Sequence, residues 1–294
     1  MPLVIETPSP SALAQAARAI APGARARCVR RLAGGTHATT HLLHVGPPEQ
    51  ELVLRRFPPG DPAPGYEAGV LAALEGLDGW APRLVDADPD GSRYGAPAVL
   101  ITRIPGNADI TNVPPAEAAT QLGRVLALIH ATPTARLSGL RDGTGAALAA
   151  SARTGDRGPA ATVVAAHGYR LAEQQRVLTH YDFWSGNVLW QQQTLTGVVD
   201  WSGASLAPRG FDVSWCRLDL ALLHGPDTAE TFLTAYEEAA GVAVADTALW
   251  DLLALSNSYR TVETWLPNYH DLGRGDLSAI DLRERHTRWT EVHL

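Results

Sequence analysis

The break at Pro105-Gly106 separates two parts of the chain that differ in character. Before it, short apolar runs alternate with glycine and proline turns, a pattern typical of short strands. After it, apolar residues recur at helical spacing, first in the helix expected to begin at Pro114-Pro115. We therefore predict a bilobal α+β chain, with a small β-rich lobe over residues 1–104 and a larger α-rich lobe over residues 105–294.

The first lobe should contain a small, mostly antiparallel sheet with one helix inserted after the third strand. The expected elements are a helix at 10–20, two strands flanking Gly34-Gly35, a third strand at 51–57, a helix at 66–74 and a buried strand at 96–104. The cluster of proline, glycine and alanine at 58–65 is expected to be a loop.

The second lobe should be mainly helical, with three short strands. Asp227 and Glu230 have the spacing of a capping box before an apolar helical run, and Gly241 stands where that helix should end. The other expected elements are helices at 159–175, 247–266 and 278–290, strands at 176–178, 187–190 and 196–200, and a loop at 142–159.

The type of basic residue excludes two kinds of active site. All 24 of them are Arg, because the sequence contains no lysine. A biased genome is the plainer explanation, but the chemical consequence is the same. A Gly-Lys-Ser/Thr phosphate loop and a lysine Schiff base are both excluded. Any cation that meets a phosphate must be an Arg, a metal ion or a helix end.

Charge and cysteine content narrow the partners and the compartment. The net charge of −7 disfavours nucleic acid and anionic membrane surfaces as main partners. No stretch approaches the roughly 20 apolar residues that a membrane span needs, and the N-terminal segment lacks the basic region of a secretion signal. Cys28 and Cys216 match no metal or redox spacing. We expect a cytoplasmic protein with free thiols.

The stretch LTHYDFWSGNVLW carries the pattern His180-x-Asp182-x-x-x-x-Asn187 between two apolar runs. A further apolar run ends at Asp200, and the strand before it should form a hairpin with the strand that follows Asn187. This hairpin would bring Asp200 back beside the loop. One carboxylate and one amide, Asp200 and Asn187, suit Mg²⁺ held jointly with substrate phosphates. Asp182 would then orient and deprotonate a hydroxyl nucleophile.

The plainer alternative for this stretch is a polar turn in which Asn and Asp are ordinary turn residues. The pattern recurs by chance often enough to be moderate evidence by itself. The apolar strands on both sides, together with the apolar-apolar-Asp ending at Asp200, favour a catalytic loop.

These motifs resemble those of the aminoglycoside phosphotransferase and choline kinase family, small-molecule kinases that share the protein-kinase fold. VLTHYDFWSGNVLW is similar to the catalytic loop of the family, and GVVDWSGASLAPRGFDVSW to its metal-binding segment. The resemblance implies that Asp182 is the catalytic base, that Asn187 and Asp200 hold Mg²⁺, and that His180 and Asp212 brace the loop by hydrogen bonding.

The same resemblance assigns nucleotide-binding residues to the first lobe. The turn with Gly34, Gly35 and Thr36 would cover the nucleotide phosphates, because glycines let backbone N–H groups approach closely. Any hairpin can hold such a turn, so the glycines alone are weak evidence. In the third strand, Arg55 stands where kinases have Lys, and Glu67 on the next helix is its implied partner.

Arg can hold phosphate oxygens bidentately, but it is bulkier and differently hydrated than Lys. Arg56 could share the role of Arg55, and the alternative for the pair of Arg55 and Glu67 is an ordinary surface pair. By resemblance only, the strand that ends the first lobe should offer backbone groups to adenine near Thr102, Arg103 and Ile104.

The histidines of the second strand invite a metal hypothesis. His37 and His41 would share one face of a strand, and His44 would face the other way. The three side chains therefore should not converge on a metal ion.

Four residues are candidates for the acceptor pocket: Tyr181, where the family often has Gly, Trp184, Glu263 and Trp265. The other tryptophans, such as Trp201 and Trp215, are expected in the core. A polycationic acceptor would need carboxylates. From residue 241 onward, acidic residues outnumber Arg by eight to five, which is a modest excess.

Taken together, the sequence predicts a kinase that uses ATP and Mg²⁺ to phosphorylate a hydroxyl of a small molecule, by resemblance an aminoglycoside or other antibiotic. A metabolic kinase of the fructosamine, choline or homoserine type is the alternative. A third hypothesis is a nucleotide-binding pseudokinase that acts as an interaction module. Loss of one of the three oxygen-bearing side chains would favour it, and none is lost. No G-x-S-x-G motif supports a serine hydrolase.

Overall fold

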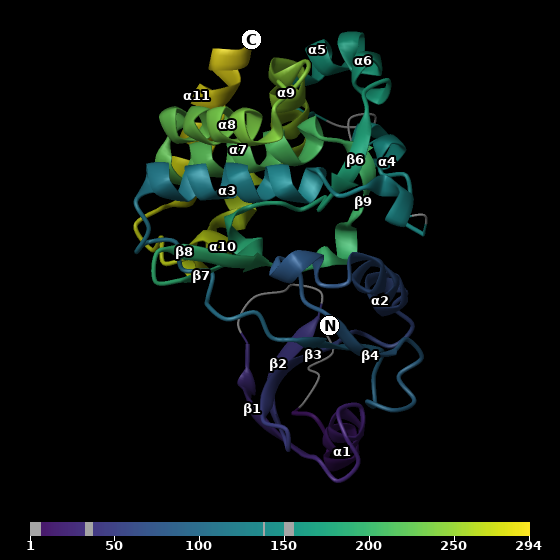
Figure 1. The fold of residues 1–294 in the computed structure, drawn as a ribbon. Coiled ribbons are helices and arrows are strands. Elements are labelled where there is room, and N and C mark those ends of the chain that lie inside the picture. Colours follow the sequence, from purple (N-terminus) through teal and green to yellow (C-terminus); the bar gives the residue numbers. More distant parts are fainter. Residues whose placement is uncertain (1–6, 33–37, 138, 150–155) are drawn as a thin grey trace. The chain divides into compact units, whose positions relative to one another are not determined.

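The computed structural model describes residues 7–32, 38–137, 139–149 and 156–294, and Figure 1 labels its elements. The chain packs into two compact units. The first contains Met1–Pro105 and Gly197–Ser202, and the second contains Gly106–Thr196 and Gly203–Leu294. The chain therefore passes between the two units three times.

The first unit is built on one five-stranded antiparallel sheet with the strand order β1-β2-β3-β5-β4. Ser9 caps the helix that precedes it, since its side chain accepts a hydrogen bond from the N–H of Ala12 at 3.2 Å. The elements are α1 (Pro10–Arg18), β1 (Arg25–Arg31), β2 (Thr39–Gly46), β3 (Gln50–Arg56), α2 (Ala63–Leu74), the short 3-10 helix η1 (Leu77–Gly79), β4 (Leu84–Asp88) and β5 (Ala98–Thr102).

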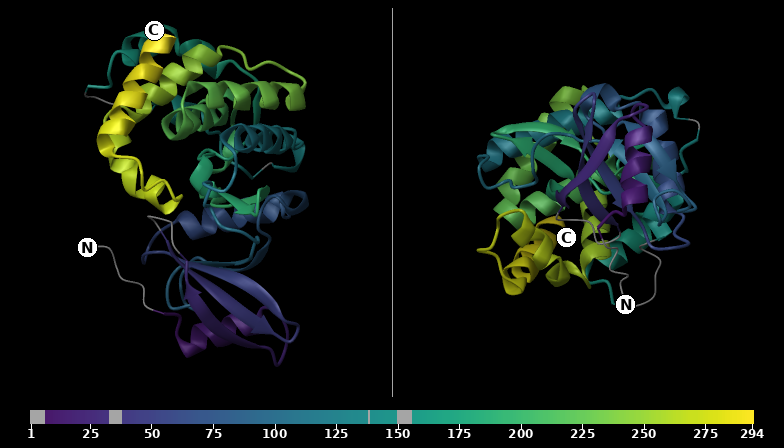
Figure 2. Two further views of the ribbon diagram at one scale, coloured as in Figure 1. Left: turned by 90° about the vertical axis from the view of Figure 1, so that its left-hand side faces the viewer. Right: turned by 90° about the horizontal axis from the view of Figure 1, so that it is seen from below.

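Alternation along the strands separates the two faces of this sheet. Leu52 and Leu54 of β3 are buried in a core with Ala12 and Ala16 of α1, and Figure 2 shows α1 against the sheet. Arg55 follows Leu54 directly in the strand. Its side chain therefore points to the opposite face of the sheet. The two helices predicted for this lobe are present as α1 and α2, and the four predicted strands are present as β1, β2, β3 and β5.

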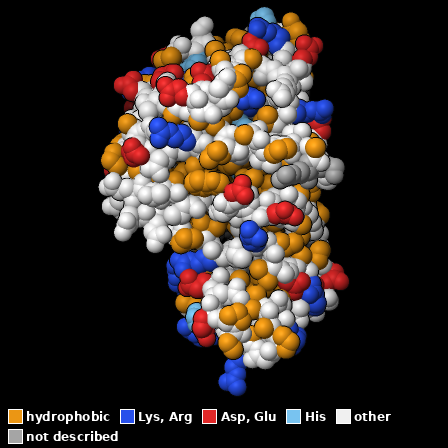
Figure 3. Space-filling view, in the orientation of Figure 1, with side chains coloured by type: hydrophobic (Ala, Val, Ile, Leu, Met, Phe, Trp, Pro, Cys, Tyr) orange, Lys and Arg blue, Asp and Glu red, His pale blue; other side chains and the backbone are white. Residues whose placement is uncertain are grey.

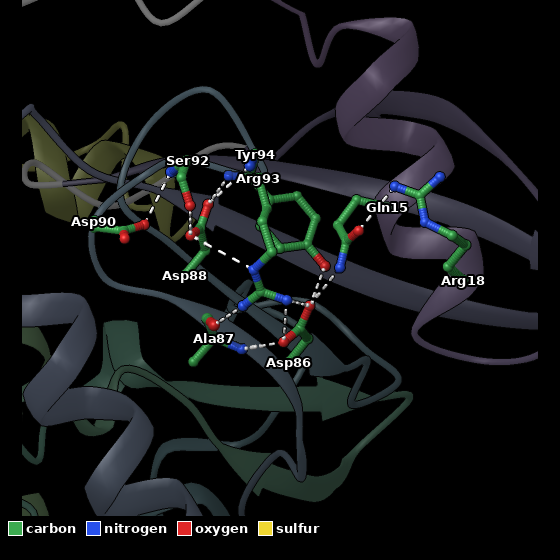
Figure 4. Close-up of polar contacts among 9 residues, drawn as sticks. All are labelled: Gln15, Arg18, Asp86, Ala87, Asp88, Asp90, Ser92, Arg93 and Tyr94. Carbon is green, nitrogen blue, oxygen red and sulfur yellow. Dashed lines mark hydrogen bonds and ion pairs between the residues drawn. The ribbon is translucent and has the colours of Figure 1, made fainter.

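Strand β4 was not predicted, because the run LVDAD is only five residues long and includes two aspartates, a residue type that is depleted in strands. It is an edge strand, and its carboxylates organise the loop that follows it (Figure 4). Asp86 accepts hydrogen bonds from the Tyr94 hydroxyl at 2.9 Å, from Arg93 at 2.7 Å and from Gln15 of α1 at 3.2 Å. Asp88 accepts the backbone N–H groups of Arg93 and Tyr94, both at 2.8 Å. These bonds fix the β4–β5 loop and tie it to α1.

The second unit is mainly helical. Two two-stranded sheets accompany its helices, β6 with β9 and the predicted hairpin of β7 with β8. The helices are α3 (Pro115–His130), η2 (Thr134–Arg136), α4 (Thr144–Ala149), α5 (Ala160–His167), α6 (Tyr169–Ala172), η4 (Ser185–Asn187), η5 (Trp201–Gly203), α7 (Gly210–His224), α8 (Pro226–Ala240), α9 (Thr247–Ser258), η6 (Val262–Trp265), α10 (Leu266–Asp271) and α11 (Ala279–His293), and the strands are β6 (Arg176–Thr179), β7 (Val188–Gln191), β8 (Thr194–Val198) and β9 (Ser205–Pro208).

Several boundaries differ from the prediction. The helix expected at 159–175 is two helices that meet at Gly168, and the one expected at 247–266 ends at Ser258. The predicted capping box at Asp227 is wrong, because α8 begins one residue earlier. Pro226 has no N–H to satisfy and suits the first helical position, with Gly225 before it. Gly241 does end α8, in a left-handed conformation.

Helix α7 was missed, and it is the helix that matters most for the site. Twelve of its 15 residues are buried, and these include polar ones such as Asp212 and Asp219, so the helix has no exposed polar face opposite an apolar one. The described helices include none that is both long and apolar enough to cross a membrane. On the face of the molecule that Figure 3 shows, acidic and basic side chains are interspersed.

Candidate active site

The predicted catalytic loop follows β6 in the second unit. Asp182 is exposed, and Asn187, at the end of η4, is buried. The amide nitrogen of Asn187 donates to the Asp182 side-chain atom Oδ2 at 2.9 Å and to the Asp182 backbone carbonyl at 2.8 Å. Both bonds use Nδ2, so the hard oxygen Oδ1 of Asn187 is the atom left for a cation. The pair therefore fits a Mg²⁺ site that an amide and phosphate oxygens share.

Asp212 holds the backbone of this loop. It is fully buried on α7, and its two carboxylate oxygens accept the N–H of His180 at 2.7 Å and that of Tyr181 at 2.9 Å. His130 Nε2 lies 3.3 Å from the same carboxylate, and Nδ1 lies 2.7 Å from the Tyr236 hydroxyl. Burial lowers the pKa of His130, so a neutral ring that donates from Nε2 and accepts at Nδ1 fits both contacts.

His180 contributes to this bracing through its backbone. Its ring is buried and meets the ring of Phe183 edge-on, with the centroids 6.2 Å apart. His180 and Asp212, each predicted to brace the loop, are joined to each other by the hydrogen bond from the His180 N–H to Asp212.

Tyr181 adopts a left-handed backbone conformation with φ of 72°, which explains why glycine suits this position. Its ring stacks on Phe211 at a centroid distance of 4.4 Å, and its hydroxyl donates to the Gly143 carbonyl at 3.1 Å. These contacts offset the roughly 1–2 kcal/mol that this conformation costs a residue with a side chain. They give Tyr181 a structural task within the loop.

Helix α7 meets the loop at two further points. Trp215 follows Asp212 by three residues, and Asp219 follows it by seven, so all three lie on one face of the helix. The indole N–H of Trp215 donates to Asp182 Oδ1 at 3.2 Å. Asp219 is buried and accepts the N–H of Ser185 at 2.9 Å and its hydroxyl at 2.5 Å.

Burial raises the pKa of Asp219 to about 6, although the Ser185 bonds lower it. Neither Trp215 nor Asp219 was predicted as a site residue. The signal lay in the i, i+3, i+7 spacing from Asp212 along α7, and it becomes visible only once that helix is known.

The remaining acceptor-pocket candidates fall into two groups. Trp265 packs edge-on against Trp215, with centroids 5.4 Å apart, and Trp184 meets Tyr269 of α10 edge-on at 6.3 Å. Glu263 instead forms an ion pair with Arg283 at 2.5 Å, and the hydrogen bond from Arg283 lowers the pKa of Glu263.

The candidate nucleotide residues of the first unit centre on Arg55. One guanidinium nitrogen lies 2.8 Å from Glu67 and the other 2.8 Å from Asp200, whose carboxylate also accepts the Ser202 hydroxyl at 2.9 Å. The predicted pairing of Arg55 with Glu67 is thus present, and it is buried. Burial raises the pKa of Glu67 to about 7 against the opposing effect of Arg55.

Arg56 points from the other face of β3. There it lies near His41, whose pKa is lowered by burial and by Arg56. Arg55, and not Arg56, therefore meets Glu67 and Asp200, the two carboxylates that the kinase resemblance names.

Thr102, Arg103 and Ile104, the hinge residues expected near adenine, differ in the hydrogen bonds that their backbone N–H groups make. The N–H of Thr102 donates to the Arg83 carbonyl at 3.0 Å, and that of Arg103 donates to the Glu51 carbonyl at 3.4 Å. Within the part of the chain that the structure describes, Ile104 is the one of the three whose N–H makes no such bond. We therefore expect Ile104 to offer the N–H donor for adenine.

Gly34, Gly35, Thr36 and His37 lie outside the described residues. His41 is buried and His44 pairs with Glu49 at 3.2 Å. Across residues 7–32, 38–137, 139–149 and 156–294, no three His, Cys, Asp or Glu side chains are grouped to hold a metal ion.

Comparison with known proteins shows the family to which the chain belongs. The family model described as "phosphotransferase enzyme family" matches residues 29–253. The chain belongs to this family. The phosphotransferase is thus a kinase-type enzyme with the kinase-like α+β fold. A search of curated protein sequences gave no significant match.

Solved structures agree on the fold of the phosphotransferase. A macrolide 2'-phosphotransferase from Brachybacterium faecium is 18% identical with a TM-score of 0.59, and the match covers 95% of this chain and 97% of that one. An ethanolamine kinase from Plasmodium vivax is 10% identical with a TM-score of 0.58, covering 92% and 85%. A thermostable mutant of an aminoglycoside phosphotransferase, in a ternary complex with AMP-PNP and hygromycin B, is 16% identical with a TM-score of 0.59, covering 89% and 92%.

Proposed function

We propose that this phosphotransferase is an ATP-dependent kinase that transfers the γ-phosphate to a hydroxyl of a small molecule. The observation that carries the proposal is the exposed carboxylate of Asp182, whose two oxygens are oriented by Asn187 and Trp215. The nucleotide complex of a related fold supports the use of ATP. All three oxygen-bearing side chains are retained, which argues against a pseudokinase.

In this proposal Asp182 accepts the proton of the acceptor hydroxyl and aligns its oxygen for in-line attack. Asp212 keeps the loop backbone fixed, so that the carboxylate is already oriented when the acceptor binds. Asn187, through Oδ1, and Asp200 would hold Mg²⁺. When bound, the ion would offset charge on the β- and γ-phosphates.

Arg55 would contact phosphate oxygens of the nucleotide, with Glu67 holding its guanidinium in place. The glycine turn with Gly34, Gly35 and Thr36 and the hinge at Thr102, Arg103 and Ile104 would complete the nucleotide contacts. We further propose a cytoplasmic protein, since ATP is supplied there and both cysteines are free.

An antibiotic such as an aminoglycoside is the first candidate acceptor, in line with the hygromycin B complex of a related fold. A small metabolic alcohol is the second, in line with the ethanolamine kinase. One observation favours the second. Of the eight carboxylates after residue 241 that a polycation would need, four are already paired with Arg: Asp246, Asp251, Glu263 and Asp276.

The test is acceptor-dependent ADP release across a panel of aminoglycosides, macrolides, sugars and amino alcohols, followed by Asp182→Asn. We expect transfer to fall by roughly 10²- to 10⁴-fold, because the base is lost while the carbonyl of residue 182 still anchors Asn187. Asp227→Asn, at an exposed position of α8, is the matched control and should keep full activity. Near-normal turnover in Asp182→Asn would contradict the proposal.

A further inference from the structure

The carboxylate of Asp182 is held by two donors from two separate elements. Oδ1 accepts from the indole of Trp215 on α7, and Oδ2 accepts from the amide of Asn187 at the end of η4. Two bonds on different oxygens fix the plane of the carboxylate. A carboxylate oxygen can accept two hydrogen bonds, so neither of these two donors by itself prevents an acceptor hydroxyl from binding.

Trp215 is itself held on both sides. Its helix is tied to the loop by Asp212 before it and by Asp219 after it. The ring of Trp265 packs against the indole at 5.4 Å, with the ring planes at 62°. Both indoles are only half buried, so this mutual packing and the hydrogen bond, more than enclosure, set the direction of the Trp215 N–H.

The chemistry of the donor suits a base. An indole N–H can only donate, so Trp215 has one way to meet a carboxylate. It is also neutral. A Lys or Arg in its place would stabilise the ionised carboxylate through its charge and make it a weaker base. Trp215 can therefore orient Asp182 without placing a positive charge beside it.

We propose that Trp215, supported by Trp265, is a positioning residue that fixes the carboxylate of Asp182 for phosphoryl transfer. This inference rests on the proposed function, in which Asp182 is the base. Trp215 acts through Asp182, so its loss should lower kcat and leave both substrate affinities nearly unchanged.

The first test compares Trp215→Phe with wild type in steady-state transfer to the best acceptor of the panel. Phe keeps an aromatic ring for Trp265 and removes only the N–H donor. We expect kcat to fall about 10-fold or more, as for a lost hydrogen bond to a charged group. The KM values for ATP and acceptor should stay within about two-fold. A change confined to the acceptor KM would overturn the proposal, because Trp215 would then be a binding surface.

Trp250→Phe is the matched control. It also removes an indole hydrogen bond in the same unit, the one from Trp250 to Gln174 Oε1 at 3.0 Å, and this bond involves no residue from 182 to 187. Its kcat should stay within about two-fold of wild type. An equal loss of kcat in both variants would mean a general loss of packing and would overturn the positioning role.

A second measurement does not depend on finding an acceptor. In protein labelled with ¹⁵N-tryptophan, the Nε1–H signal of Trp215 is assigned as the one missing from Trp215→Phe. Asp182→Ala should move this signal to higher field, whereas Asp227→Asn should leave it in place. An unmoved signal would overturn the contact. A moved signal in a protein that phosphorylates no acceptor would support the contact and reject the proposed function.

Discussion

The buried carboxylate of Asp212 fixes the backbone at the start of the catalytic loop. Its oxygens take up two consecutive backbone N–H groups at the start of the catalytic loop, and it has no exposed surface. Asn in its place offers one oxygen and turns an NH₂ group toward the other N–H. One donor is then left unpaired in the interior.

We therefore expect Asp212→Asn to lower the free energy of unfolding by about 3 kcal/mol and to reduce kcat. Urea unfolding measures the first effect and acceptor-dependent ADP release the second. Asp227→Asn controls for removal of an exposed charge. A loss below about 1 kcal/mol would mean that the loop backbone is held by other contacts.

Arg55 and Arg103 provide a matched comparison of ion pairs within the first unit. Arg55 and its partner Glu67 are buried, whereas Arg103 pairs with Glu51 at the surface. Arg55→Met leaves Glu67 as an uncompensated buried carboxylate. We expect a loss of about 3–5 kcal/mol in Arg55→Met and at most about 1 kcal/mol in Arg103→Met, measured by denaturant unfolding. Equal losses would contradict the burial of the Arg55 pair.

The catalytic-loop residues that could be predicted from the sequence are those that belong to one short motif. Asp182 and Asn187 stand five residues apart in one loop, so the sequence alone placed them near each other, and the structure adds the hydrogen bond between them. Trp215 reaches Asp182 across 33 residues, and its role depends on a helix with no exposed polar face. A tryptophan in an apolar run is indistinguishable from a core residue until the helix is placed.

At the scale of elements, helices α3 and α8 approach each other at Gly123. A Cβ there would lie 2.7 Å from the Phe232 carbonyl and 2.8 Å from the Tyr236 nitrogen. The glycine is thus required by a close approach of two helix backbones. Gly69 of α2 is its natural control, since a Cβ there meets open space.

We expect Gly123→Ala to lower the free energy of unfolding by about 1–3 kcal/mol, because α8 must move away. Gly69→Ala should raise it by about 0.4–1 kcal/mol, because alanine has less freedom to lose in a helix. Thermal or urea unfolding of both variants gives the comparison. Changes of the same sign would contradict the close packing at Gly123.

The contact between α9 and α11 should make the fold sensitive to acid. His286 of α11 is buried beside the Ser258 hydroxyl at 2.8 Å, and burial, with Arg283 nearby, lowers the pKa of His286 to about 4. Between about pH 6.5 and 4 the unfolded chain takes up a proton that the folded chain does not. Stability from this group is therefore complete above pH 6.5 and is lost as the pH falls.

At pH 5 this loss amounts to about 2 kcal/mol relative to pH 7. His286→Gln should therefore show a smaller drop in unfolding free energy between pH 7 and pH 5 than wild type, by about that amount. His167→Gln, at an exposed position of α5, should leave the drop unchanged. An identical pH dependence in His286→Gln and wild type would show that the buried ring titrates normally.

Element types followed the sequence wherever a period or a turn signal was present. Helix α3 and the hairpin of β7 and β8 were anticipated on that basis. Strand β4 and helix α7 were not, for opposite reasons. The first is a five-residue edge strand with two aspartates, which are depleted in strands. The second is buried on nearly all sides, so its sequence lacks the polar and apolar stripes on which helix prediction depends.

For the whole molecule, the short return of residues 197–202 into the first unit is the feature that contiguous lobes do not anticipate. The N–H of Val198 donates to the Trp80 carbonyl at 2.8 Å, and Asp200 meets Arg55. In the second unit, the N–H of Trp190 donates to the Asn107 carbonyl at 2.7 Å. Amides eight residues apart thus belong to different units.

Native-state hydrogen exchange can test this assignment in the full chain. The amide of Val198 should respond to denaturant together with the amides of β3, and that of Trp190 together with the second unit. The assignment is wrong if Val198 and Trp190 exchange with the same denaturant dependence while β3 differs.

The three passages of the chain between units also bear on how such genes can recombine. A crossover at codon 105 would carry Arg55 and Glu67 into a hybrid but leave the codons for residues 197–202 with the other parent. Arg55 would then face an acidic partner from a different lineage. Viable hybrids of related genes should therefore exchange two separate blocks together, or retain both from one parent.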